Sequence, residues 1–211
     1  MSIDIKKLNE EMRHAHPSEI IKKAIEIGGD RPMVSTNFRP LEAVVLDMAT
    51  KVKNDVTVVW VDSGYMMPHT YAFAEKTIEQ LKLNIDVYVP KMTAARFGGD
   101  AAIPQPEQEE ELATFAEIFK LEPFRRALAE VNPSVWFTSL RQEQNQNRST
   151  MDIFDMDANG MLKCNPVFYW TEADMEAYVQ ENQLPDEKRY FDPTKPSLSH
   201  ECGLHKSGFL K

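Results

Sequence analysis

The sequence predicts an α/β fold, with a doubly wound and mostly parallel sheet flanked by helices. A nearly continuous apolar and β-branched run at 56–61 is typical of a strand that is covered on both faces. Strand-like and helix-like stretches alternate between residues 33 and 89, which favours parallel strands joined by helices. Hydrophobic residues make up 42% and charged residues 27% of the chain, a composition that excludes disordered and fibrous proteins.

The first half of the chain supplies the centre of this sheet. Apolar residues recur at helical spacing before Gly28 and Gly29, which end that helix. Pro68 is placed to begin a later helix, because proline is favoured in the first helical turn. The predicted elements are a helix ending at Gly28, a strand at 33–35, a helix at 41–52, a strand at 56–61, a helix at 68–83 and a strand at 85–89.

The second half continues the pattern after a loop at 98–111, which we expect to run into an acidic helix start. A helix at 115–131, interrupted near Pro123, precedes a strand at 135–138. The stretch 157–160 is a turn signal. Thr171 is expected to cap a last helix.

Charge and cysteine content limit the classes of function. Lys and Arg number 24 against 33 Asp and Glu, and a net charge of −9 disfavours an electrostatic nucleic-acid binder. A local basic pocket for a small anion is still allowed. With only Cys164 and Cys202, a four-cysteine iron–sulfur or zinc site is excluded within one chain. The N-terminal residues lack a long apolar run, so we expect no signal peptide, no membrane span and a cytoplasmic location.

The first candidate site follows the strand at 33–35. Ligands of parallel sheets bind where strand carboxyl ends meet helix N-termini. Free backbone N–H groups and small hydroxyls there favour a phosphate or sulfate, and an arginine adds positive charge. A structural turn is the alternative. The candidate residues are Ser35, Thr36, Asn37, Phe38 and Arg39.

Two further candidates also follow strands. Asp62, Ser63 and Gly64 end the strand at 56–61, where a carboxylate can bind a ribose or adenine group and where a turn is the alternative. Arg141 and Arg148, with amides such as Gln144 between them, suit oxyanion binding through planar multi-donor contacts. The alternative for this second segment is a solvated helix start.

The fourth candidate lies near the C-terminus. Cys202 is flanked by His200, His205 and Lys206, and a cationic setting raises the thiolate fraction of a cysteine. A metal site of His200, Cys202 and His205 is disfavoured, because no fourth ligand is indicated. Cys164 lies on a predicted strand and is expected to be a small core residue.

In this order, these segments resemble the phosphoadenylyl-sulfate (PAPS) reductase family of the adenine nucleotide alpha-hydrolase-like superfamily. Residues 201–205, Glu-Cys-Gly-Leu-His, are similar to its C-terminal catalytic signature. Residues 136–148 resemble its W-F-x-x-L-R-x-E-Q-x-x-x-R segment, and residues 62–71 resemble its D-T-G-Y-x-F-P-E-T-Y stretch. Lys120, Glu122 and Pro123 are similar to its K-x-E-P helix start.

The resemblance implies a nucleotide-binding α/β domain at 1–196 and a flexible C-terminal catalytic tail at 197–211. It implies thioredoxin-dependent reduction of PAPS to sulfite and adenosine 3′,5′-bisphosphate, through an S-sulfocysteine on the catalytic Cys202. Thioredoxin or glutaredoxin would be the co-substrate of a homodimer that binds no resident cofactor or metal. The implied substrate-binding residues are Ser35, Thr36, Asn37, Phe38, Arg39, Asp62, Ser63, Gly64, Lys120, Arg141, Gln144, Arg148 and His205.

Two departures from the family pattern keep alternatives open. Arg39 stands where the family's S-x-S-F-G loop has glycine, and the stretch 184–199 is shorter and lacks the family's G-Y-x-S-x-G-D-x-H segment. The paired cysteines of cluster-containing adenylyl-sulfate (APS) reductases are missing, which favours PAPS as substrate. The alternatives are an APS reductase without a cluster, a non-catalytic adenine-nucleotide-binding relative, and an ATP pyrophosphatase, whose S-G-G-x-D-S loop differs from residues 35–39.

Overall fold

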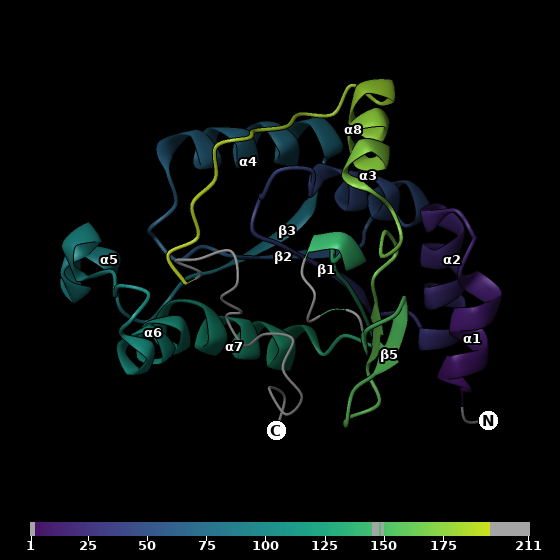
Figure 1. Cartoon of the computed structure of the whole chain (residues 1–211), viewed down its shortest axis with the longest axis horizontal. Coiled ribbons are helices and arrows are strands. Elements are labelled where there is room, and N and C mark those ends of the chain that lie inside the picture. Colours follow the sequence, from purple (N-terminus) through teal and green to yellow (C-terminus); the bar gives the residue numbers. More distant parts are fainter. Residues whose placement is uncertain (1–2, 145–147, 149, 195–211) are drawn as a thin grey trace.

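The predicted fold class is confirmed by a computed structural model, which describes residues 3–144, 148 and 150–194. Six strands form one sheet in the order β3-β2-β1-β4-β6-β5, flanked by helices (Figure 1). All neighbouring strands are parallel except β5 and β6, which are antiparallel. The strands are β1 (Pro32–Thr36), β2 (Thr57–Val61), β3 (Asn84–Tyr88), β4 (Val135–Phe137), β5 (Phe154–Met156) and β6 (Leu162–Cys164).

The helices follow the strands in the alternation that the sequence indicates. The α-helices are α1 (Ile5–Met12), α2 (Pro17–Gly28), α3 (Ala43–Val52), α4 (Pro68–Leu81), α5 (Ala94–Phe97), α6 (Glu109–Ala116), α7 (Glu122–Val131) and α8 (Glu172–Glu181). Short 3₁₀ turns lie at Gly99–Ala102 and Gln142–Gln144. A π-helical turn, Glu117–Leu121, joins α6 to α7, so the helix predicted at 115–131 is interrupted just before Pro123.

Alternate residues of each strand face opposite sides of the sheet, which sorts the core into two layers. Val34, Val58 and Phe137 pack into the larger cluster together with residues of α2, α3, α4 and α8. Their neighbours Met33, Val59 and Trp136 pack on the other side against α7. Figure 1 shows α3 and α4 on one side of the sheet and α7 on the other.

Local signals explain where the helices begin and end. The side chain of Thr171 accepts a hydrogen bond from Asp174 N, and that of Asp174 bonds back to Thr171 N, which is a capping box. Gly29 ends α2 with a φ of 103°, a conformation that favours glycine. The strand β5 and the single turn of α5 were not expected, because elements this short carry no periodic pattern.

The strand order places a topological switch point between β1 and β4. From β1 the chain builds β2 and β3 on one side, and then returns to add β4 on the other side. Connections that leave in opposite directions open a crevice at the carboxyl ends of these strands, where doubly wound sheets bind ligands. Within the described ranges, no helix combines the length and apolar character needed to cross a membrane.

Candidate active site

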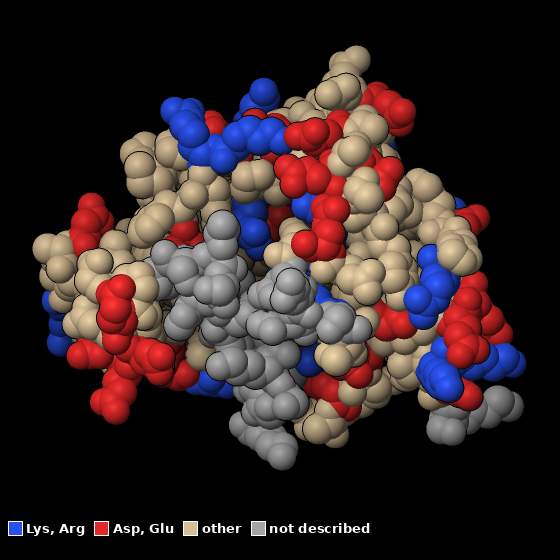
Figure 2. Space-filling view, in the orientation of Figure 1, with Lys and Arg blue, Asp and Glu red and all other residues tan. Residues whose placement is uncertain are grey.

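A pocket that is partly open to solvent lies at the switch point. Figure 2 shows Lys and Arg atoms within a hollow near the middle of one face, beside Asp and Glu atoms. The polar and charged residues that line the pocket are Ser35, Thr36, Asn37, Arg39, Glu42, Lys120, Thr138, Ser139 and Arg148. It therefore joins three segments that the sequence had singled out separately.

The loop between β1 and α3 has an unusual backbone. Phe38 and Leu41 have φ values of 52° and 68°, in the left-handed region that residues other than glycine seldom adopt. The ring of Phe38 is buried and meets that of Trp60 edge to face, with centroids 4.9 Å apart. Phe38 thus anchors the loop in the core and does not line the pocket.

The backbone N–H groups of this loop, expected to be free for an anion, are engaged within the protein. The N–H groups of Asn37 and Arg39 donate to Oε2 of Glu42 at 2.9 and 3.3 Å. Phe38 N donates to Thr36 Oγ1 at 3.0 Å. The expectation of free donors is wrong because the carboxylate of Glu42 and the hydroxyl of Thr36 satisfy them, and sequence reasoning missed Glu42.

Asp62, Ser63 and Gly64 form a tight turn after β2. Asp62 Oδ1 accepts hydrogen bonds from Gly64 N and from the hydroxyl of Tyr71, both at 2.8 Å. Burial and the Asp62 carboxylate raise the pKa of Tyr71. These three residues do not line the main pocket, although Ser63 lines a smaller one beside Asn37 and Lys120. The geometry here matches the turn that was the alternative to a nucleotide contact.

Lys120 is brought into the pocket by the π-helical turn and forms a buried ion pair. Its Nζ lies 2.6 Å from Asp192 Oδ2 and 3.1 Å from Thr194 Oγ1. Burial raises the pKa of Asp192, but the ammonium of Lys120 and the hydrogen bonds from Lys120 and Thr194 outweigh that effect. The pKa of Asp192 falls to about 2. The sequence pointed to Lys120 but gave no sign of Asp192, which is 72 residues away.

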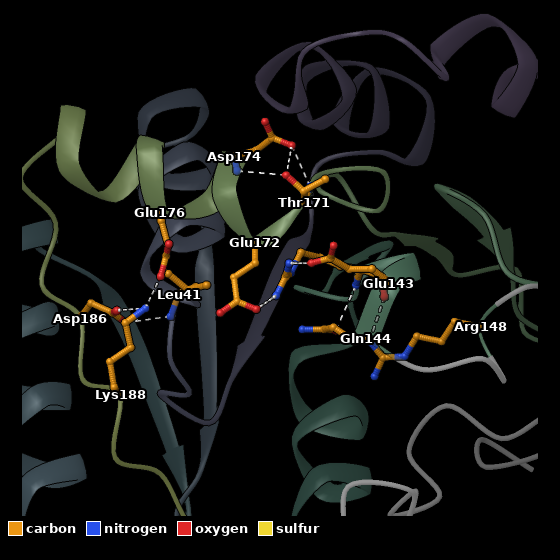
Figure 3. Close-up of polar contacts among 11 residues, drawn as sticks. Leu41, Glu143, Gln144, Arg148, Thr171, Glu172, Asp174, Glu176, Asp186 and Lys188 are labelled. Carbon is orange, nitrogen blue, oxygen red and sulfur yellow. Dashed lines mark hydrogen bonds and ion pairs between the residues drawn. The ribbon is translucent and has the colours of Figure 1, made fainter.

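The segment after β4 holds two buried arginines. Arg148 Nη1 donates to the carbonyl oxygen of Arg141 at 3.3 Å and to Oε1 of Gln144, which also accepts from Arg141 N at 3.2 Å (Figure 3). The guanidinium of Arg141 pairs with Glu143, and lies 3.9 Å from Glu172 at the start of α8. Arg148 lines the pocket and Arg141 does not. The expected pair is thus adjacent, with Gln144 as the bridge.

The chain matches the family model of the phosphoadenosine phosphosulfate reductase domain over residues 31–192. That match covers most of the chain. This chain belongs to the phosphoadenosine phosphosulfate reductase domain family. The members of the family are oxidoreductases, so the enzyme class predicted from the sequence is confirmed.

Curated relatives of this reductase family extend the match along the chain. The phosphoadenosine 5′-phosphosulfate reductase of Vibrio cholerae serotype O1 is 33% identical over 200 residues, which cover 82% of this chain and 77% of the relative. That of Xylella fastidiosa is 32% identical over 226 residues, covering 97% of this chain and 95% of the relative. A phosphoadenylyl-sulfate reductase from Candida auris, crystallised with phosphate, shares the fold with a TM-score of 0.73. It is 24% identical and covers 88% of this chain and 90% of its own.

Of the two cysteines of this family member, only Cys164 lies among the residues that the structure describes. Cys164 lies on β6 and is completely buried, as expected, and burial raises the pKa of its thiol well above the ordinary value. A thiol held neutral in an apolar core is a poor nucleophile. Cys202 and His205, the candidates from the C-terminal signature, lie outside the described residues.

Proposed function

We propose that this protein reduces PAPS to sulfite and adenosine 3′,5′-bisphosphate. One observation carries the proposal beyond family membership. In a chain of net charge −9, the switch-point pocket is lined by three basic side chains, those of Arg39, Lys120 and Arg148. These three cations exceed the one carboxylate of the lining, that of Glu42, and such an excess of positive side chains in an acidic protein suits a small anionic ligand.

The proposed chemistry begins with Cys202 as nucleophile. Its thiolate attacks the sulfonate sulfur of PAPS, the bond from that sulfur to the phosphate oxygen breaks, and adenosine 3′,5′-bisphosphate leaves with the electron pair. The enzyme then carries an S-sulfocysteine. A thiolate of reduced thioredoxin or glutaredoxin attacks the sulfur of Cys202 and releases sulfite. A second thiol of that partner resolves the mixed disulfide, so the dithiol supplies the two electrons.

The end of the described chain supports the assignment of Cys202. Thr194 hydrogen-bonds to Lys120, a lining residue of the pocket. Cys202 follows Thr194 by eight residues (202 − 194). An extended chain spans at most about 3.6 Å per residue, which is roughly 29 Å here and ample to reach the pocket. We therefore propose residues 197–211 as the catalytic tail that carries Cys202, with His205, to the substrate.

The basic side chains have a defined task in this scheme. A thiolate and an anionic substrate repel each other, so positive groups must offset both charges as the sulfur approaches. We assign this task first to Arg141 and Arg148, and second to Arg39, Lys120 and His205. We further propose a homodimer in the cytoplasm, without a resident metal, that receives electrons from thioredoxin or glutaredoxin.

The test is to trap the covalent intermediate. Protein mixed with PAPS in the absence of reductant should gain the mass of one SO₃ group on the peptide that contains Cys202. Cys202→Ser should abolish both the adduct and sulfite formation, whereas Cys164→Ser is the matched control and should keep most activity. An adduct on Cys164, or none on either cysteine, would overturn the assignment.

The same assay distinguishes the remaining alternatives. Turnover of APS at the rate of PAPS would identify a reductase that does not read the 3′-phosphate. Tight nucleotide binding without any adduct would identify a non-catalytic nucleotide-binding protein. Release of pyrophosphate from ATP would identify an ATP pyrophosphatase.

A further inference from the structure

The carboxylate of Glu42 lies in the place where the loop after β1 would be expected to hold a ligand anion. Its Oε2 atom accepts hydrogen bonds from Thr36 Oγ1 at 2.8 Å, Asn37 N at 2.9 Å and Arg39 N at 3.3 Å. Its Oε1 atom accepts from Ser139 Oγ at 3.2 Å, which links the loop after β1 to the segment after β4. Glu42 therefore bonds to both sides of the switch point.

The remaining backbone donors of residues 37–42 are also satisfied from within the chain. Phe38 N donates to Thr36 Oγ1, and Glu42 N donates to the carbonyl oxygen of Arg39. Leu41 N donates to Asp186 Oδ1 at 2.9 Å, in the segment that follows α8 (Figure 3). Pro40 has no N–H. A substrate anion thus finds no unused N–H group along this stretch of the loop.

The backbone of the loop after β1 needs such hydrogen bonds to keep its conformation. Left-handed conformations at two residues other than glycine are unfavourable, and they persist only where the surroundings fix them. Phe38 is fixed by its buried ring, and Leu41 by its bond to Asp186. Glu42 holds the residues on either side of Phe38, because it binds Asn37 N and Arg39 N with one oxygen atom.

We infer that Glu42 is a positioning residue whose carboxylate is the resident anion of this loop. It fixes Thr36, Asn37, Arg39 and Ser139 around the pocket, and the anionic groups of the substrate bind to the basic side chains that line the same pocket. The part that concerns substrate rests on the proposed function. The part that concerns the loop rests on the contacts of Glu42 alone.

Two substitutions separate the shape of Glu42 from its charge. Glu42→Gln keeps an oxygen that can accept from Thr36 and the two N–H groups, and its amide can donate to Ser139 Oγ. Glu42→Ala leaves partly buried donors without an acceptor and opens a space that a small carboxylate can fill. Acetate and formate are therefore the probes, with chloride at equal ionic strength as the control.

The first measurement is the melting temperature, which does not depend on any enzymatic activity. A ligand that binds only the folded state raises the melting temperature by mass action. Acetate or formate should raise that of Glu42→Ala, and should leave the wild type, Glu42→Gln and the exposed control Glu75→Ala unchanged. Equal responses of all four proteins would overturn the inference even if the reductase proposal holds.

The second measurement is kcat, KM and the affinity for adenosine 3′,5′-bisphosphate. Glu42→Ala should lose at least tenfold in kcat/KM and in nucleotide affinity, and acetate should restore part of both. Glu42→Gln should keep kcat within about threefold of the wild type.

Tighter nucleotide binding by Glu42→Ala would instead show that the substrate displaces Glu42. A tenfold or larger loss of kcat in Glu42→Gln would also overturn the inference, and this variant serves where Glu42→Ala fails to fold.

Discussion

Two segments meet at the switch point, and they carry opposite kinds of charge. The loop after β1 surrounds a carboxylate, that of Glu42, with backbone N–H groups and hydroxyls. The segment after β4 holds two buried guanidinium groups, those of Arg141 and Arg148, with carboxylate and amide partners. The donors of the first segment are engaged by the carboxylates of Glu42 and Asp186, whereas Arg141 in the second segment pairs with exposed carboxylates.

The partners of Arg141 explain why its guanidinium can exchange them for a ligand. Glu143 and Glu172, which pair with Arg141, have side chains that are 42% and 65% exposed. Ion pairs with such exposed groups contribute only about 0–1 kcal/mol, so a bound anion can replace them at little cost. In the loop after β1, the donors include backbone N–H groups, and their acceptor is the carboxylate of Glu42 at the end of the same loop. Replacing this acceptor would therefore disturb the loop itself.

Lys120 is a third case between these two. It lines the pocket like Arg148, but its partner Asp192 is almost as buried as Lys120, with side chains that are 10% and 6% exposed. Removing one member of a buried pair leaves an uncompensated charge, which costs far more than breaking an exposed pair. Burial of the partner therefore decides how firmly each cation is held, and the following experiments test that rule.

The largest effect is expected from Asp192→Ala, which removes the buried carboxylate 2.6 Å from the Lys120 ammonium. We expect the free energy of unfolding to fall by about 3–5 kcal/mol. Urea unfolding measures this loss. The matched control is Glu176→Ala, which breaks the exposed pair with Lys188 and should cost under about 1 kcal/mol. Equal losses in the two variants would contradict the rule.

The next effect is on nucleotide binding. Arg141→Ala and Arg148→Ala should each weaken the binding of adenosine 3′,5′-bisphosphate by about one to two decades, because a charge-assisted contact contributes roughly 1.5–3 kcal/mol. Calorimetry measures the affinity. Arg148→Lys should fall between the wild type and Arg148→Ala, since lysine keeps the charge but not the planar fork. Unchanged affinity in both alanine variants would place the anion site elsewhere.

The contribution of the buried Lys120–Asp192 pair to the free energy of unfolding should also depend on pH in the acid range. The pKa of Asp192 is about 2 in the folded protein, against an ordinary value of 3.8. Its contribution to stability is therefore full above about pH 4 and is lost as the pH falls towards about 2, because the unfolded chain binds the proton first. The difference in unfolding free energy between wild type and Asp192→Asn should shrink by roughly 2 kcal/mol over that range. A difference that stays constant with pH would assign the stabilisation to hydrogen bonding alone.

The smallest effect is expected from Glu172→Gln. Glu172 is 65% exposed and lies 3.9 Å from Arg141, so its removal frees that guanidinium at little cost. We expect nucleotide affinity to rise by no more than about fivefold. Glu176→Gln, on the same helix but paired with Lys188, is the control and should leave the affinity unchanged. A large rise would show that exposed partners restrain the arginines more than their burial suggests.

The sequence predicted those parts of the fold that depend on neighbours in the chain. The run at 56–61, the glycines at the end of α2 and the cap at Thr171 are local signals, and the structure places β2, the end of α2 and the start of α8 accordingly. The short β5 has no such pattern, because it is defined by pairing with β6. Tertiary pairing of this kind has no signature within three residues.

The residues of the site also divide into those with a local sequence signal and those without one. Arg39, Lys120 and Arg148 were identified by position or motif, and the structure brings them to one pocket. Glu42 had only a local signal that was missed, an acidic residue directly before α3 and three positions after Arg39. Asp186 and Asp192 had none, since their partners Leu41 and Lys120 are 145 and 72 residues away.

That distance has a consequence for how the protein is made. All six strands are complete once residue 164 has been synthesised, but the carboxylates that hold Leu41 and Lys120 arrive only with residues 186 and 192. Figure 1 shows this late segment returning from α8 along α4 towards the sheet. A nascent chain on the ribosome therefore has its sheet, and the residues that line the pocket, before it has the two carboxylates that hold Leu41 and Lys120. A message truncated upstream of codon 186 would yield the strands in full and a binding site that lacks both of its distant carboxylates.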